Sequence, residues 1–349
     1  MPFKRREGPV PHLVSLDTAS PKHTLEQDDV ARRAIAMFAP GPSGWDRLSP
    51  IYRNAEIETR QSCVPIDWFM APHGWQERSR LYVDESLALA DRAIRRSLAD
   101  CGLELGDIDG LVVVSTTGIA TPSLDALLQE RLGLRRDLRR LPVFGFGCAG
   151  GVLGLARTAA MAMAEPGSRI LCVVVELCGL TFRPADTSPA NIVATALFGD
   201  GAAAAVISTE GDGPAIGPWG EHSFPGSLDV MGWDIGDDGF GVRFSRDIPK
   251  LVREDLVPVL DAYLERHGLA LTDFDAITAH PGGAKVIDAL EETFHRPLPE
   301  ARSVLRDFGN MSAPTVLFVL DRLRPWTGRV LMTALGPGFT AGFLALGPA

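Results

Sequence analysis

This chain has fewer basic than acidic residues. Its 349 residues include 34 Lys and Arg against 44 Asp and Glu, which gives a formal net charge of −10 at pH 7. An acidic chain without a basic run is poorly suited to bind nucleic acid or an anionic membrane surface, so we expect neither partner. The basic N-terminal residues precede no apolar segment, and no run approaches the roughly 18 apolar residues of a membrane helix. We therefore predict no signal peptide and no membrane span.

Cysteine is also scarce, and its pattern is irregular. The five cysteines include no CxxC pair, which argues against a disulfide framework and against a zinc site. The chain also lacks the motifs of phosphate loops, dinucleotide-binding turns and zinc proteases. We expect a cytoplasmic protein with reduced thiols and no metal. The cysteines are Cys63, Cys101, Cys148, Cys172 and Cys178.

What the sequence does contain is a repeated design. A helical stripe over residues 83–101 precedes a turn and the apolar strand 111–115, and residues 255–280 repeat this order. Five positions of the two turns match at a constant offset of 166 residues. They are Gly102, Leu103, Leu105, Asp107 and Asp109 in the first turn, and Gly268, Leu269, Leu271, Asp273 and Asp275 in the second.

A second pair of segments repeats in the same way. One helix of small residues begins near Gly147 and precedes strand 169–176, and another helix begins near Gly309 and precedes strand 329–335. Alternating helices and buried apolar strands predict an α/β fold with parallel-type sheets covered by helices on both faces. We divide the chain into related halves, residues 1–210 and 211–349.

Cys148 is the candidate nucleophile. It lies in FGFGCAGG, between a predicted strand and a helix start, where the helix dipole and free N–H groups lower a thiol pKa. The flanking glycines permit a tight turn and close approach of a substrate. The alternative is a buried structural cysteine.

His280 and Asn310 lie in corresponding turns of the second half. His280 ends a strand in ITAHPGG, at the edge where open α/β sheets place ligands, and Asn310 precedes a helix. A structural histidine and a helix N-cap are the alternatives. Halves packed about a pseudo-twofold axis would bring both turns to Cys148. A nucleophile, an imidazole and an amide donor are what acyl transfer requires.

Together these motifs resemble those of the type III polyketide synthases, the chalcone synthase-like enzymes of the thiolase superfamily. The similarity extends over about residues 10–346. It is carried by FGCAGG with Cys148, ALFGDGAAA with Phe198, AHPGG with His280, FGNMSA with Asn310, and LGPGF at 335–339. The resemblance implies a homodimer with a thiolase-like five-layered αβαβα fold from two duplicated halves.

The resemblance also implies a reaction and a set of binding residues. Malonyl-CoA would be decarboxylated and condensed onto an acyl-CoA starter held on Cys148. His280 would keep the thiolate ionised and, with Asn310, stabilise the enolate. No cofactor is needed, because the CoA thioesters are substrates. The implied substrate-binding residues are Phe198 as gatekeeper, Phe244, Cys178, Thr117, Thr121, Gly336, Pro337, Gly338 and Phe339, with Arg53 and Arg60 as contacts for CoA.

Some positions depart from the pattern of the plant enzymes. Ala334 and Leu335 precede GPGF, Thr121 stands where a Met reaches the partner subunit's cavity, and Cys178 replaces a cavity Thr. With MGWDIGDDGF, these features resemble bacterial alkylpyrone and alkylresorcinol synthases, which accept fatty acyl starters. We therefore predict alkylpyrones or alkylresorcinols as products, with a short or aromatic starter as the alternative.

Three alternative functions were compared with this pattern. A ketoacyl-ACP synthase III stops after one condensation and takes malonyl from acyl carrier protein, for which the acidic chain shows no obvious basic docking site. A cysteine hydrolase shares Cys, His and Asn, but the AHPGG context argues against it. A non-catalytic scaffold needs no such trio, so we rank it last.

Overall fold

The computed structural model describes residues 8–39 and 45–348. Nine strands form one continuous sheet in the order β11–β12–β13–β8–β1–β7–β6–β4–β5. The strands of the first half are β1 (His12–Ala19), β4 (Gly110–Val114), β5 (Arg139–Val143), β6 (Arg169–Leu177) and β7 (Asp200–Ser208). Those of the second half are β8 (Ala215–Ser223), β11 (Ala276–Ala279), β12 (Val330–Gly336) and β13 (Thr340–Gly347).

The two halves repeat one topology. Strands β4, β6, β7 and β1 correspond in order to β11, β12, β13 and β8, and in each set one parallel pair is followed by two antiparallel pairs. In the matching turns, Asp107 and Asp273 each accept a hydrogen bond of 2.8 Å from the backbone N–H three residues earlier. The predicted duplication is confirmed. The prediction of parallel-type sheets is wrong for five of the eight strand pairs of the large sheet, because burial on both faces produces an apolar run whatever the strand direction.

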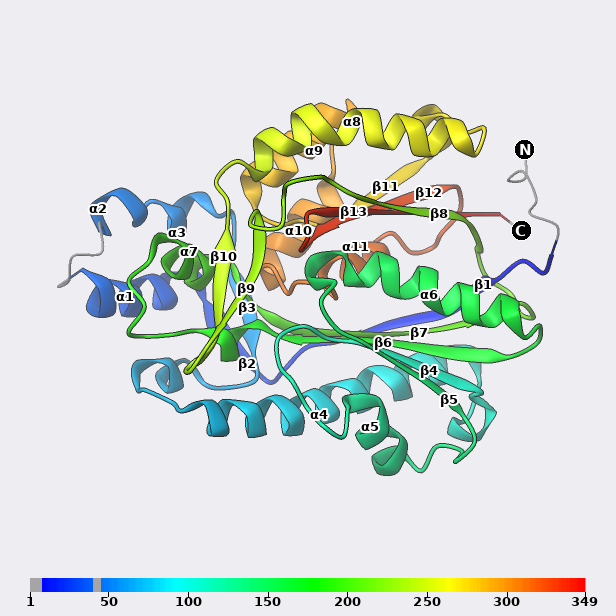
Figure 1. Ribbon diagram of the computed structural model, residues 1–349, viewed down its shortest axis with the longest axis horizontal. Coiled ribbons are helices and arrows are strands. Elements are labelled where there is room, and N and C mark those ends of the chain that lie inside the picture. The colour runs from blue at the N-terminus through cyan, green and yellow to red at the C-terminus, as the bar shows by residue number, and fades with distance from the viewer. Residues whose placement is uncertain (1–7, 40–44, 349) are drawn as a thin grey trace.

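Helices and sheet form five layers (Figure 1). Helices α6 (Gly150–Ala164) and α11 (Thr315–Arg322) lie in the middle and contact strands of both halves. Helix α4 (Trp75–Cys101) packs on the outer face of the first half beside α5 (Leu124–Leu132). Helices α8 (Ile248–Arg266), α9 (Ala284–Phe294) and α10 (Pro299–Phe308) cover the outer face of the second half. This is the αβαβα order of the predicted fold. The division at residues 210/211 falls between β7 and β8 and stays a prediction.

Helix α6 is built from small apolar residues. With the turn before it, the stretch Gly147–Ala164 is long and apolar enough to cross a membrane by length and composition, although 67% of it is buried inside the fold. The stretch includes Arg157, so it is not the uncharged apolar run whose absence we predict. Its place between the two halves of the large sheet explains its composition, because small side chains allow both halves to pack closely on one helix.

Shorter elements surround one end of the sheet. A hairpin of β9 (Met231–Gly236) and β10 (Gly239–Phe244) lies outside the large sheet, as does the pair of β2 (His23–Glu26) and β3 (Thr59–Ser62). The short helices there are α1 (Gln27–Phe38), α2 (Trp45–Leu48), α3 (Ile51–Asn54), η1 (Ile66–Met70), η3 (Gly147–Ala149), η4 (Cys178–Thr181) and α7 (Pro189–Leu197).

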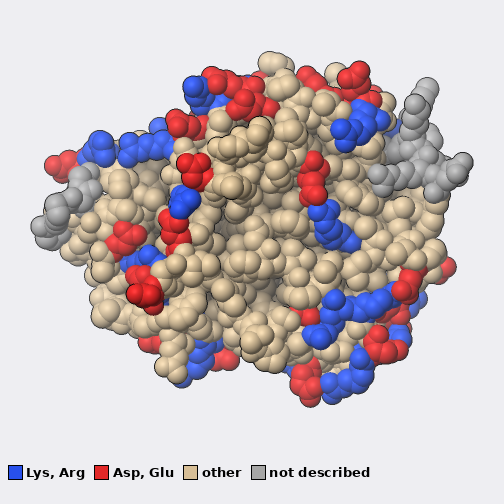
Figure 2. Space-filling model, in the orientation of Figure 1, with Lys and Arg blue, Asp and Glu red and all other residues tan. Residues whose placement is uncertain are grey.

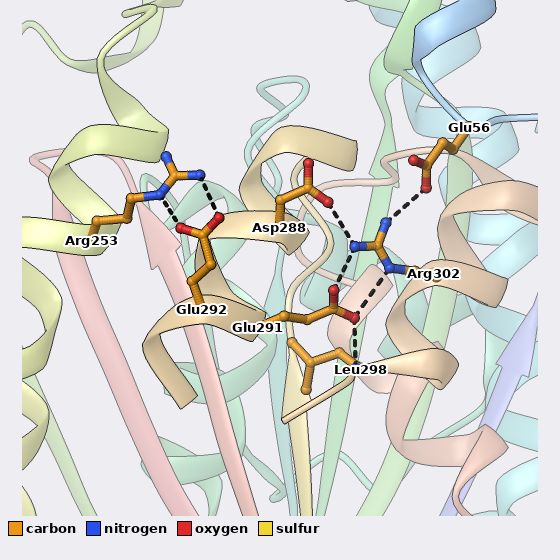
Figure 3. Close-up of polar contacts among 7 residues, drawn as sticks. All are labelled: Glu56, Arg253, Asp288, Glu291, Glu292, Leu298 and Arg302. Carbon is orange, nitrogen blue, oxygen red and sulfur yellow. Dashed lines mark hydrogen bonds and ion pairs between the residues drawn. The ribbon is translucent and has the colours of Figure 1, made fainter. Parts of the chain in front are cut away.

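Ion pairs fix the outer helices of the second half. Arg302 of α10 binds Glu56 at 2.9 Å, and also Asp288 and Glu291 of α9 at 2.7 Å and 2.5 Å (Figure 3). In the same view Arg253 of α8 pairs with Glu292 of α9. Arg302 therefore connects the segment before β3 to α9, whose first turn borders the cavity described next.

Candidate active site

Cys148, His280 and Asn310 line one cavity of about 360 Å³, called here the main cavity. Cys148 lies in η3 immediately before α6, His280 follows β11, and Asn310 lies two residues after α10. These residues come from both halves of the chain, and the structure brings all three together. The visible face of the molecule has a hollowed, largely uncharged centre, and charged side chains of both signs are scattered around it (Figure 2).

The turn that carries Cys148 is closely packed. Gly147 has φ +46°, and a Cβ there would lie 2.6 Å from Cδ of Pro337. The N–H of Gly147 donates to Oγ1 of Thr116 at 3.1 Å. Sγ of Cys148 lies 3.6 Å from Oγ of Ser312, and burial raises the pKa of this thiol to about 12.

His280 is held through its backbone, whereas its ring has no partner. Its N–H donates to the carbonyl of Thr333 at 3.0 Å, and its own carbonyl accepts from Gly282 at 3.0 Å. The residue is 5% exposed, and neither ring nitrogen has a hydrogen-bond partner among the residues that the structure describes. A buried structural histidine would have its ring nitrogens paired, so these are available to a ligand in the main cavity.

Desolvation opposes the ion pair that we predict between Cys148 and His280. Burial lowers the pKa of His280 to about 3 and raises that of Cys148 to about 12, so burial alone favours a thiol and a neutral imidazole. A thiolate and an imidazolium formed together would leave the net charge unchanged. The N-terminal end of α6 would stabilise the thiolate.

Asn310 is oriented by backbone groups on both sides. Its Oδ1 accepts from the N–H of Ser312 at 2.8 Å, and its Nδ2 donates to the carbonyl of Gly282 at 3.1 Å. Helix α11 begins only at Thr315, so Asn310 is not its N-cap and the predicted helix start is too early. Ser312 has φ +58°, a left-handed conformation that is unusual for serine and typical of functional sites.

The backbone of Asn310 also positions Phe198. The N–H of Asn310 donates to the carbonyl of Leu197 at 2.8 Å, and the N–H of Gly199 donates to the carbonyl of Asn310 at 3.0 Å. Gly309 permits this approach, because a Cβ there would lie 2.7 Å from the carbonyl oxygen of Leu197. The sequence motifs around Phe198 and Asn310 therefore meet in one bridge between the two halves.

Phe198 and Phe244 separate the main cavity from a smaller one. Phe244 lines the main cavity, whereas Phe198 and Cys178 line a second cavity of about 70 Å³. The two phenyl rings are 5.5 Å apart between centroids. The partition formed by Phe198 and Phe244 is consistent with the gatekeeper position predicted for Phe198.

The predicted CoA contacts need correction. Arg60 is 3% exposed, and its guanidinium donates to the carbonyls of Thr195 and Phe198 at 2.6 Å and 3.2 Å, which argues against a contact with CoA. Arg53 is exposed on α3 but does not line the main cavity. Exposed cations do line it, and none has an ion-pair partner among the described residues. They are Arg47, Arg246 and Lys285, called here the rim cations. Sequence reasoning missed them because their segments lie far apart in the chain.

Other predicted pocket residues lie behind the cavity wall. Thr117 turns its hydroxyl to the carboxylate of Glu176 at 2.7 Å, and Thr121 is exposed, so neither borders the two cavities. The turn from Gly336 to Phe339 connects β12 to β13 and packs behind Cys148, whereas residues 333–335 line the main cavity.

Glu176 is a buried carboxylate that the sequence analysis missed. It accepts hydrogen bonds from the N–H groups of Thr116 and Thr117, each at 2.9 Å. Burial nevertheless raises its pKa to about 7. A single Glu inside an apolar strand is the signal that could have identified it.

Known proteins match this chain over nearly its whole length. Residues 66–211 match the N-terminal domain of the chalcone and stilbene synthases, and residues 221–349 match their C-terminal domain. The 1,3,6,8-tetrahydroxynaphthalene synthase of Streptomyces peucetius is 38% identical over 96% of this chain and 92% of that protein. The chain belongs to the chalcone and stilbene synthase family. It is thus a type III polyketide synthase, a transferase that condenses malonyl-CoA.

Two further relatives support this assignment, and their names refer to different products. The crystal structure of 1,3,6,8-tetrahydroxynaphthalene synthase from Streptomyces coelicolor superimposes with a TM-score of 0.90 at 27% identity, covering 96% of this chain and 99% of that one. An alpha-pyrone synthesis polyketide synthase-like protein, Pks18, of Mycobacterium tuberculosis is 28% identical over 94% of this chain and 88% of that protein. The fold of this type III synthase is therefore thiolase-like.

Proposed function

We propose that Cys148 is the nucleophile of this synthase and that His280 is its general base. The imidazole takes the proton of Sγ, Sγ attacks the carbonyl carbon of the starter thioester, and the CoA thiolate leaves with that proton. The observation that carries this proposal is the buried His280 ring, whose two nitrogens have no partner in the cavity that Cys148 also lines. An imidazole placed in this way can accept a proton and then return it.

We further propose that His280 and Asn310 bind the thioester oxygen of malonyl-CoA. When the carboxylate leaves as CO2, the electron pair of the broken C–C bond forms an enolate whose charge lies on that oxygen. A ring N–H and Nδ2 of Asn310 can donate to it, and the carbonyl of Gly282 already holds the amide in place. Removing one such preorganised donor typically costs about 3 kcal/mol of transition-state stabilisation.

The rim cations are suited to the phosphate groups of CoA. Arg47, Arg246 and Lys285 line the main cavity from three separate segments. Unpaired cations at the mouth of an apolar cavity attract an anionic ligand even though the chain as a whole is acidic. The phosphopantetheine of an acyl carrier protein has the same chemistry, so both carriers belong in the test.

A fatty acyl starter is the substrate that we favour. The second cavity behind Phe198 and Phe244 is lined mainly by apolar side chains of α1, η1 and α7, which suit an alkyl chain. The relative named for alpha-pyrone synthesis supports alkylpyrones or alkylresorcinols as products. Because other relatives are named for tetrahydroxynaphthalene synthesis, a short or aromatic starter is the alternative.

We propose that the protein works as a homodimer in the cytoplasm. Strand β5 is an edge of the large sheet, and Ile119 and Phe144 beside it are 51% and 53% exposed. An exposed apolar edge of this kind is suited to pairing with a second copy. Thr121 lies in the same exposed loop, in agreement with its predicted place near the partner's cavity.

The experiment is incubation with labelled malonyl-CoA and acyl-CoA starters from C2 to C18, with products identified by mass spectrometry. Pyrones or resorcinols with an alkyl chain are expected. A single β-ketoacyl product, formed only with malonyl on a carrier protein, would point instead to a ketoacyl-ACP synthase III. Release of the free starter acid alone would point to a hydrolase.

A further inference from the structure

The β9–β10 hairpin forms a wall of both cavities. It pairs with no strand of the nine-stranded sheet, and an isolated two-stranded hairpin is at best marginally stable. Its place therefore depends on contacts with other elements. On β10, Phe240 is buried, Val242 lines the second cavity and Phe244 lines the main cavity. Alternate residues of a strand share one face, so this face spans the partition.

A row of aromatic rings connects the hairpin to the partition. Trp75, at the start of α4, contacts Phe240 with ring centroids 5.3 Å apart. Trp233 of β9 lies 6.1 Å from Phe240 and also 6.1 Å from Phe198. Phe198 in turn contacts Phe244. A displacement of the hairpin would therefore move the rings that separate the cavities.

Two arginines bind the turn of this hairpin. Arg183 pairs with the carboxylate of Asp238 at 2.9 Å and donates to the carbonyl of Gly239. Arg78 of α4, which is buried, donates to the carbonyl of Asp238. Charge-assisted hydrogen bonds of this type are roughly twice as strong as neutral ones. The turn is thus held to the body of the protein from two sides.

Arg183 also binds the opposite wall of the second cavity. Its carbonyl accepts a hydrogen bond of 2.9 Å from Nδ2 of Asn191, in the first turn of the helix that ends before Phe198. The hairpin backbone lies close to its side chain, because a Cβ on Gly241 would be 2.7 Å from Nη1. One arginine therefore fixes the spacing between β10 and α7.

We propose that Arg183, supported by Arg78, is a positioning residue for starter selection. By clamping the hairpin turn, it keeps Phe244 and Trp233 against Phe198 and the passage between the cavities narrow. A straight acyl chain passes this constriction, whereas a branched or ring-bearing acyl group of similar size does not. This inference rests on the proposed entry of the starter through the main cavity toward the second one.

The test compares Arg183→Gln with Arg243→Gln. Arg243 lies on the same hairpin, but its ion pair with Asp234 joins only the two strands, so it is the matched control. We would measure kcat/KM with straight-chain, branched and phenyl-substituted acyl-CoA starters of similar size. We expect the straight-to-branched ratio to fall about tenfold in Arg183→Gln, as loss of one charge-assisted hydrogen bond would produce. Arg183→Lys should recover part of the ratio, and Arg243→Gln should match the wild type.

Hydrogen exchange of residues 231–244 supplies a readout that does not depend on activity. Faster exchange there in Arg183→Gln, with unchanged decarboxylation of malonyl-CoA, is expected. Faster exchange with an unchanged ratio of starters would overturn the selection role. Unchanged exchange would overturn the clamp itself. If Arg183→Gln does not fold, Asp238→Asn decides in the same assays, because it removes the ion pair at an exposed position. A wild type that uses no acyl-CoA would refute the proposed function and leave the exchange result readable.

Discussion

At the scale of single residues, the proposed chemistry depends on two groups that line one cavity. The pKa of Cys148 is raised and that of His280 is lowered by desolvation, so each is shifted toward its neutral form. A neutral pair can become an ion pair by one proton transfer. The rest of the chain holds these side chains through backbone contacts, so the ring and the thiol stay available to substrates.

Cys148→Ala should abolish polyketide formation, because no thioester can form. The substitution is small and should preserve the fold, and decarboxylation of malonyl-CoA should persist because it depends on His280 and Asn310. Product analysis by mass spectrometry and release of labelled CO2 measure the two steps. Full product formation by the variant would remove Cys148 as the nucleophile.

His280→Gln should affect two measurements. Decarboxylation of malonyl-CoA should fall at least about 100-fold, since the enolate loses a charge-stabilising donor. Alkylation of Cys148 by iodoacetamide near pH 6 should also slow, because the imidazole no longer accepts the thiol proton. Peptide mass spectrometry can follow Cys148, with the partly buried Cys101 as the internal reference. An identical pH profile in both proteins would exclude the proton transfer, although not the role in decarboxylation.

Glu176→Gln should make stability less dependent on pH. The pKa of Glu176 is about 7 in the folded protein against 4.5 for an ordinary Glu, so the folded state retains its proton longer. Stability therefore falls as pH rises through this window, a loss that Gln avoids. Between pH 5 and pH 8, the free energy of unfolding of the variant should rise relative to wild type by up to about 3 kcal/mol. Urea unfolding at both pH values measures this, and equal pH dependence in both proteins would contradict it.

At the scale of elements, the two cavities are bordered mostly by segments that lie outside the large sheet. The β9–β10 hairpin, α7 and α1 enclose the second cavity, and α3, α9 and β12 contribute to the main one. Such segments can change without disturbing the layered core, which is how one fold supports different starters and products.

Cys178→Phe tests whether the second cavity receives the acyl chain. Burial of each methylene contributes roughly 0.8 kcal/mol, so an acyl chain whose end enters this cavity would favour longer starters. An added ring cannot be absorbed by a packed interior without strain. We expect lost activity with C12–C18 starters and retained activity with short ones, measured as kcat/KM from C2 to C18. Cys101→Phe, on the outer helix α4, is the control. An unchanged profile in Cys178→Phe would exclude this acyl path.

At the scale of the whole molecule, the two halves share a central helical layer, and the edge of the first half is left open. The same topology occurs twice, yet β5 has no counterpart among the strands described for the second half. No element in the described part of the chain covers the exposed apolar side chains beside β5. A second copy of the chain could cover them.

Ile119→Asp with Phe144→Asp should convert the protein from dimer to monomer, because two buried carboxylates would oppose an apolar interface. Light scattering after size exclusion measures the mass. Leu228→Asp is the control, since Leu228 is 80% exposed in a loop between β8 and β9. A monomeric wild type, or a double variant that remains dimeric, would contradict the proposed interface.

The sequence by itself determined the repeated halves and the three residues that meet in the main cavity. Apolar periodicity and a constant offset are local properties, and the motifs around Cys148, His280 and Asn310 each combine a turn with a strand or helix end. Strand direction was not determined, because β7 and β13 are buried on both faces and show the same apolar runs as parallel strands.

Only the tertiary structure decided which polar side chains are available. Arg60 and Thr117 read as pocket residues in the sequence, but buried carbonyls and a buried carboxylate bind them. Arg47, Arg246 and Lys285 come from segments that no local pattern connects. They converge because α2, the loop between β10 and α8, and α9 border the same cavity. The burial and hydrogen bonding of a side chain depend on the residues that pack around it. The fold, rather than the local sequence, determines which residues those are.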